Sequence, residues 1–207
     1  MAQQSLPPTG HAAMRGKLAV EDLFSLERYA RERPAFRARV LEHKRERQLA
    51  VGPNLTWLFE DRLTIQYQVQ EMLRAERIFE PEGIAEELES YNPLIPDGQN
   101  WKVTLLIEFP DAAERRQALA QFRRIEDCCW IRVAGHEPVF AVADEDLERE
   151  NDEKTSAVHF LRFELATPMI AALRAGAELT AGVDHEQYRH TVTVPTPVRQ
   201  SLLGDFT

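Results

Sequence analysis

The sequence has little cysteine and no long apolar stretch, and each shortage excludes a class of protein. Its only two cysteines among 207 residues are the adjacent Cys128 and Cys129. Two neighbouring thiols cannot build a disulfide framework or a four-thiolate metal site, so we interpret both as structural residues in a reducing cytoplasm. No segment approaches the roughly 18 consecutive apolar residues that a membrane-spanning helix needs. The sequence therefore predicts a cytoplasmic protein without membrane insertion.

Recognised catalytic motifs are also missing. No glycine-rich phosphate loop follows an expected strand, and no His-Glu-x-x-His pattern occurs. The sequence alone therefore identifies no catalytic residue. Its 34 acidic and 25 basic side chains give a formal net charge of −9. Because this charge repels a phosphate backbone, we expect no nucleic-acid partner.

Hydrophobic periodicity and turn residues predict an α+β fold, with a helical N-terminal half packed on a mostly antiparallel sheet. We expect residues 1–16 to form a disordered tail and residues 17–207 to form one mixed α+β domain. Pro34 is expected to separate two helices in the N-terminal half. Other helices are expected over 63–79, 83–91, 112–124, 168–175 and the C-terminus, and strands over 48–51, 55–59, 101–109, 129–133, 139–142, 156–165, 178–183 and 191–194.

Two polar residues lie on the apolar faces of expected helices. His43 continues the apolar stripe of the helix after Pro34, and Glu76 lies about 20° from Ile65 on the next long helix. If the two stripes pack together, His43 and Glu76 come within direct or water-mediated hydrogen-bond reach. A structural pair is one interpretation, and a metal or acid–base site is the other, because imidazole and carboxylate groups serve both.

Three further histidines form a second group of candidates. His159 shares strand parity with Leu161 and Phe163, whereas His185 and His190 flank an expected turn. Their separations match no recognised zinc motif, so surface or structural roles are the alternative. A transition metal is the cofactor that these side chains suggest. The candidate ligands, not necessarily of one site, are His43, Glu76, His159, His185 and His190.

Two segments carry charge of opposite sign. Residues 28–47 contain eight basic and three acidic side chains, and residues 144–153 contain seven carboxylates and one arginine. Each segment is interpreted as a solvated surface or as a docking surface for a partner of opposite charge. Arg37 and Arg39 are the candidate partner-binding residues of the basic segment.

Several short motifs occur in a fixed order over about residues 18–206. They are His43-Lys44, Gly52-Pro53-Asn54, Leu58-Phe59-Glu60-Asp61, Tyr67-Gln68-Val69-Gln70-Glu71-Met72, Tyr91-Asn92-Pro93-Leu94-Ile95-Pro96 and His159-Phe160-Leu161-Arg162-Phe163. Together they resemble an uncharacterised bacterial family catalogued as domain of unknown function 3501. The resemblance supplies no catalytic residue.

Members of that family are commonly encoded near rubrerythrin-like diiron proteins and iron–sulfur oxidoreductases. The resemblance therefore implies a cytoplasmic role in redox metabolism or peroxide defence. We expect an accessory protein that contacts a rubrerythrin-like or iron–sulfur redox protein. The alternative is a metal-binding protein or an oxidoreductase that uses buried histidine and glutamate side chains.

Overall fold

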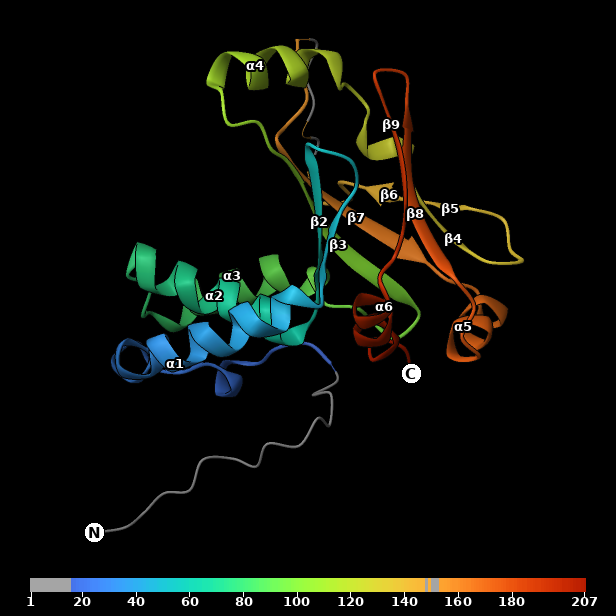
Figure 1. Ribbon diagram of the computed structural model, residues 1–207. Coiled ribbons are helices and arrows are strands. Elements are labelled where there is room, and N and C mark those ends of the chain that lie inside the picture. Colours follow the sequence, from blue (N-terminus) through green and yellow to red (C-terminus); the bar gives the residue numbers. More distant parts are fainter. Residues whose placement is uncertain (1–15, 148, 150–152) are drawn as a thin grey trace.

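Two antiparallel β-sheets pack against each other in the computed structural model, which describes residues 16–147, 149 and 153–207 (Figure 1). The five-stranded sheet has the order β1-β2-β3-β7-β6, and the four-stranded sheet has the order β5-β4-β8-β9. Apart from Gly16, the expected N-terminal tail lies outside the described residues. The strands are β1 (Gln48–Ala50), β2 (Leu55–Glu60), β3 (Asn100–Ile107), β4 (Cys129–Val133), β5 (Val139–Phe140), β6 (Val142–Ala143), β7 (Val158–Glu164), β8 (Leu179–His185) and β9 (Tyr188–Thr193).

A single extended segment joins the edges of the two sheets. Residue Phe140 of β5 pairs with Trp130 of β4, whereas Val142 of β6 pairs with Arg162 of β7. Only Ala141 separates β5 from β6. The segment expected as one strand over 139–142 therefore pairs with β4 in its first half and with β7 in its second half. We call residues 139–143 the crossing segment.

The main hydrophobic core lies between the two sheets, as the period-two pattern of the strands requires. Large aromatic side chains fill it: Trp57 of β2 stacks on Phe163 of β7 with ring centroids 5.3 Å apart. Near the C-terminus, Phe206 contacts Trp101 at a centroid distance of 5.0 Å. These contacts fix the relative position of β2, β3, β7 and the chain end.

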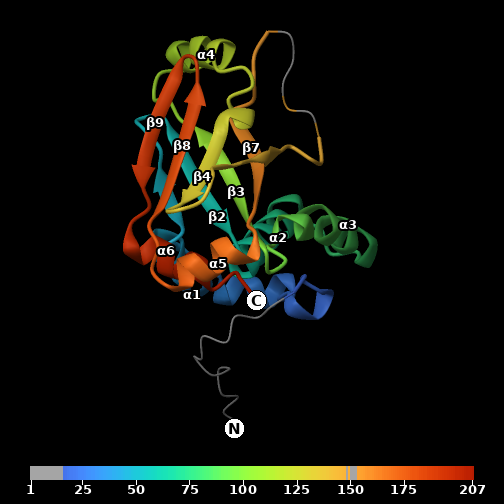
Figure 2. The same cartoon turned by 90° about the vertical axis from the view of Figure 1, so that its right-hand side faces the viewer.

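The helices gather at the two ends of the sheets. The first three helices pack together beside one end, and α4 lies at the opposite end (Figures 1 and 2). This arrangement confirms the predicted α+β fold with a helical N-terminal half. No helix in the described part of the chain combines the length and apolar character needed to cross a membrane. The helices are η1 (Val20–Asp22), α1 (Leu26–Arg45), α2 (Arg62–Glu76), α3 (Pro81–Tyr91), η2 (Asn92–Leu94), α4 (Ala112–Gln121), η3 (Glu126–Cys128), α5 (Thr167–Arg174) and α6 (Thr196–Leu203).

The expected break at Pro34 is wrong, because α1 continues through this residue. Tyr29 lies before the proline and Phe36 and Val40 lie after it, and all three are buried in one small hydrophobic cluster. These tertiary contacts hold both halves in one helix. Pro34 itself is exposed, and so is the residue four positions earlier whose carbonyl loses its helical partner. Water can hydrate that carbonyl, which reduces the penalty of the missing hydrogen bond.

Candidate functional site

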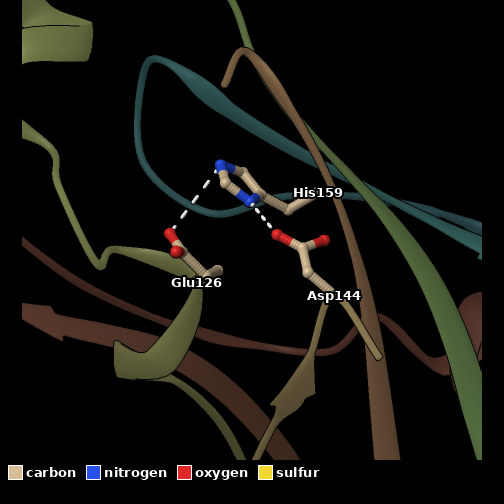
Figure 3. Close-up of side chains that lie close together, drawn as sticks. All are labelled: Glu126, Asp144 and His159. Carbon is tan, nitrogen blue, oxygen red and sulfur yellow. Dashed lines mark hydrogen bonds and ion pairs between the residues drawn. The ribbon is translucent and has the colours of Figure 1, made fainter. Parts of the chain in front are cut away.

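Three ligand-type side chains meet at the junction of the two sheets (Figure 3). Glu126 opens η3, Asp144 directly follows β6, and His159 lies near the start of β7. One potential ligand atom from each residue lies within 4.8 Å of the other two. We call these three residues the acid–histidine cluster. Among the described residues, they form the only group of three such side chains at this spacing.

The strand pattern explains why His159 points inward. It shares a face of β7 with Leu161 and Phe163, and these three residues are 0%, 2% and 0% exposed. The crossing segment then brings Asp144 to the same place, because Asp144 N donates to Phe160 O at 2.8 Å. Phe160 N donates in return to Asp144 Oδ1 at 2.9 Å. This reciprocal pair fixes Asp144 beside β7.

The two ring nitrogens of His159 face different oxygen atoms. Nδ1 lies 2.6 Å from Asp144 Oδ2. Nε2 lies 3.7 Å from Glu126 Oε2, 3.0 Å from Thr155 Oγ1 and 3.1 Å from Ser156 O. The imidazole is therefore oriented by a carboxylate on one side and faces a group of oxygen atoms on the other.

Arg149 holds the outer oxygen of Asp144. Its guanidinium lies 3.3 Å from Asp144 Oδ1 and 2.6 Å from Asp146 Oδ1, and it stacks over the Phe160 ring at 4.6 Å. Asp146 balances the charge of the arginine. Asp144 Oδ2 thus remains directed at His159.

Burial and the two carboxylates act on His159 in opposite directions. Burial lowers its pKa, whereas the hydrogen bond to Asp144 and the charges of Glu126 and Asp144 raise it, and the pKa ends above its usual value. Both carboxylate side chains are only 10% exposed. The interior of the cluster therefore favours positive charge at the imidazole.

The predicted contact between His43 and Glu76 is wrong. His43 Nε2 instead lies 2.5 Å from Asp61 Oδ2, and Asp61 caps α2 by accepting from Thr64 N at 2.9 Å. Glu76 is exposed at the other end of α2, about 22 Å away at 1.5 Å per residue. Helical phase placed both residues on apolar faces, but it carries no information on position along the helix axes.

His185 and His190 do not join His159. His185 Nε2 donates to Arg123 O at 2.9 Å, and its Nδ1 accepts from Gln187 N at 3.2 Å, so both ring nitrogens are engaged locally. His190 is exposed on β9 and packs against the Tyr188 ring with centroids 4.5 Å apart. Neither histidine belongs to a three-residue ligand group within the described chain.

Glu126 and Asp144 were missed as candidates in the sequence. The only available signal for Asp144 was its place as the first carboxylate after a strand, where the acidic segment begins. Glu126 had no signal beyond its place before the cysteine pair.

Burial raises the pKa of both Cys128 and Cys129, and nearby carboxylates add to the effect. Both therefore remain thiols at neutral pH, which disfavours thiolate chemistry.

The chain matches the model of one protein family over nearly its whole length. That family is described as protein of unknown function (DUF3501), and the match covers residues 17–206. A novel protein of unknown function from Burkholderia pseudomallei K96243, known from a crystal structure, shares 49% sequence identity with this chain. The two structures superpose with a TM-score of 0.88. The similarity covers 92% of this chain and 100% of that one. No curated protein matches this chain. The chain therefore belongs to the DUF3501 family of proteins of unknown function.

Proposed function

We propose that this protein binds one divalent transition-metal ion at the acid–histidine cluster. The observation that supports the proposal is the convergence of Glu126, Asp144 and His159 from three separate elements onto one buried point. Imidazole and carboxylate groups are the usual protein ligands of such ions. His159 is thus the one predicted metal ligand that the proposal retains.

The distances fit a site built on His159 Nε2 and Glu126. Metal–ligand bonds of about 2.0–2.2 Å place two donors on one ion about 3–4 Å apart. The 3.7 Å between His159 Nε2 and Glu126 Oε2 falls in this range. Asp144 accepts from the opposite ring nitrogen at 2.6 Å, which is how carboxylates orient metal-binding histidines. Glu126 and His159 are therefore the direct ligands of the proposed site, and Asp144 positions the imidazole.

The donor set selects the class of ion. Thr155 Oγ1 and Ser156 O lie on the same side of the ring as Glu126, within 3.1 Å of Nε2. One nitrogen surrounded by several hard oxygen donors suits Mn²⁺ or Fe²⁺ better than a thiol-preferring ion. The competing interpretation is a metal-free hydrogen-bond network that makes the same contacts.

Metal analysis separates the two interpretations. Protein purified without an affinity tag is dialysed against Mn²⁺, Fe²⁺ or Zn²⁺, and the bound metal is measured by elemental analysis. We expect one ion per chain in the wild type. Glu126→Gln keeps the shape of the side chain but removes the ligand charge, and we expect it to lower metal affinity at least about tenfold.

Glu145→Gln is the matched control, because Glu145 is an exposed neighbour of Asp144 that pairs with Arg162 at 2.8 Å instead. It should bind metal like the wild type. A wild type without bound metal after dialysis against all three ions would contradict the proposal. So would equal loss in the Glu126→Gln and Glu145→Gln variants, since that would point to general charge rather than to the cluster.

A second candidate function is docking of a rubrerythrin-like or iron–sulfur redox protein through α1. The observation that favours it is the exposure of Arg37 and Arg39, neither of which forms an ion pair with another described residue. Purified candidate partners would be tested for association in rising salt. Replacing both arginines by glutamate should slow association at low salt while leaving the circular dichroism spectrum unchanged. Unchanged association would remove this surface from the interface.

A further inference from the structure

A second feature of the structure is a hollow of about 390 Å³. It is open to solvent and is bordered by one face of α4, the turn between β1 and β2, and the β8–β9 hairpin. Figures 1 and 2 show α4 at the same end of the molecule as the turn of this hairpin. The volume falls within the range of about 300–1,000 Å³ that is typical of small-molecule sites. Its lining includes no residue of the acid–histidine cluster.

A continuous series of aromatic rings forms one side of the hollow. Phe109 contacts Phe122 at a centroid distance of 6.1 Å, and Phe122 contacts Tyr188 at 5.3 Å. Tyr188 in turn contacts His190 at 4.5 Å. Phe122 and Tyr188 are each only 6% exposed, whereas His190 is exposed at the rim. Accessible ring surface is therefore offered by the exposed His190 and the half-buried Phe109, which the buried Tyr188 and Phe122 support, and a flat molecule can stack there.

These rings are held in place without any ligand. The Tyr188 hydroxyl donates to Val51 O at 2.8 Å and accepts from Asn54 N at 3.0 Å. Gly52, with a φ of 77°, packs so closely that an added Cβ would overlap Tyr188 and the His190 ring. Because the hydroxyl proton is already used, Tyr188 offers a ligand no hydrogen-bond donor, and its buried ring supports the ring of His190. The β1–β2 turn thus preorganises the stacking surface.

The opposite wall is polar but carries little charge. Gln117 and Gln121 lie one turn apart on α4, and Gln187 lies in the β8–β9 turn; all three are exposed. Each amide both donates and accepts hydrogen bonds. Glu114 is the only formally charged side chain among the described residues that line the hollow. The wall therefore offers hydrogen bonds in both directions and no cation to attract a phosphate or a carboxylate.

We infer that this hollow binds a small flat nitrogen heterocycle that is neutral or positively charged, such as a purine base or nucleoside without phosphate. The aromatic side stacks on the ring of the ligand, and the glutamine amides pair with its ring nitrogens and exocyclic groups. Glu114 disfavours an anionic ligand by repulsion. Binding at this hollow does not depend on the proposed metal site.

Nuclear magnetic resonance of the full chain tests the inference directly. Adenosine and nicotinamide are the neutral probes, AMP is the anionic counterpart of adenosine, and ribose lacks the aromatic ring. We expect adenosine or nicotinamide to shift the side-chain amide signals of Gln117, Gln121 and Gln187 in a saturable manner. AMP should bind several-fold more weakly than adenosine, and ribose should leave these signals unchanged.

His190→Ala removes one stacking ring from an exposed position, and we expect it to weaken binding about fivefold or more. His136→Ala is the matched control, since His136 lies outside the hollow in the β4–β5 connection. Three outcomes would each overturn the inference: no shift of the amide signals by either neutral probe, AMP binding as tightly as adenosine, or unchanged binding in His190→Ala.

Discussion

Arg47 connects three parts of the chain from a buried position. Its guanidinium, 2% exposed, donates to Phe59 O at 3.0 Å and to Glu60 O at 3.1 Å. It also donates to Asp205 Oδ2 at 2.6 Å, beyond the end of α6. Asp61 Oδ2 lies 3.4 Å away and links the same group to His43. The arginine thus joins the β2 backbone to the helical N-terminal half and to the C-terminus.

We expect Arg47→Met to lower the free energy of unfolding by about 3–5 kcal/mol, because it leaves Asp205 buried without its cation. Urea unfolding measures the change. Arg45→Met is the control, since the Arg45 side chain is 74% exposed, and it should change stability by no more than about 0.5 kcal/mol. Adding Asp205→Asn to Arg47→Met should recover part of the loss. Equal stability of Arg47→Met and the wild type would refute this account.

At the scale of elements, α1 carries an internal proline that its packing tolerates. Pro34→Ala restores an amide proton to the middle of the helix at an exposed position. We expect it to stabilise the protein by about 1–2 kcal/mol, after the entropy gained by the unfolded chain is subtracted. The measurement is the urea midpoint.

Pro197→Ala provides a control of opposite sign. Pro197 lies in the first turn of α6, where the restored amide has no helical partner. This substitution should therefore stabilise nothing and lose a few tenths of a kcal/mol through the unfolded state. If Pro34→Ala also destabilised the protein, the ring of Pro34 would have to contribute packing that outweighs the hydrogen bond.

The sequence predicted a strand well where the alternation of apolar and polar residues alone determines it. The alternation of His159, Leu161 and Phe163 predicted both strand β7 and its inward face, and the burial of all three confirms it. The change of sheet within the crossing segment was not predictable, because the pattern from Val139 to Val142 predicts one strand whichever neighbour it pairs with. For the same reason the cluster had no motif: Glu126 and Asp144 reach His159 only through tertiary pairing.

For the whole molecule, pH should act on stability through the contact between α6 and the N-terminal half. Burial raises the pKa of Asp205 to about 6, although Arg47 and His43 lower it; Asp61 adds to the rise. The unfolded chain releases this proton near its usual pKa of about 4. Between these values the folded state binds more protons, so the Asp205 contribution to stability increases as pH falls.

Comparison of the wild type with Asp205→Asn isolates this contribution. We expect the free energy of unfolding of the wild type to rise relative to the variant as pH decreases from about 7 to about 4. Urea titrations at several pH values measure the difference. A difference that stays constant over this range would show that Asp205 titrates alike in both states.

The assignment of residues 17–207 to a single domain stays a prediction.

The crossing segment has a kinetic consequence. Because Ala141 N bonds to Cys129 O of β4 while Asp144 N bonds to Phe160 O of β7, neither sheet can open along this edge without disturbing the other. Amide protons of Asp144 and Phe160 should therefore exchange with solvent only through large cooperative openings. An ion held by His159, which is 0% exposed, would be released no faster than those openings occur. The rate of ion exchange would then be set by the opening of the connected sheets rather than by the strength of the metal–ligand bonds.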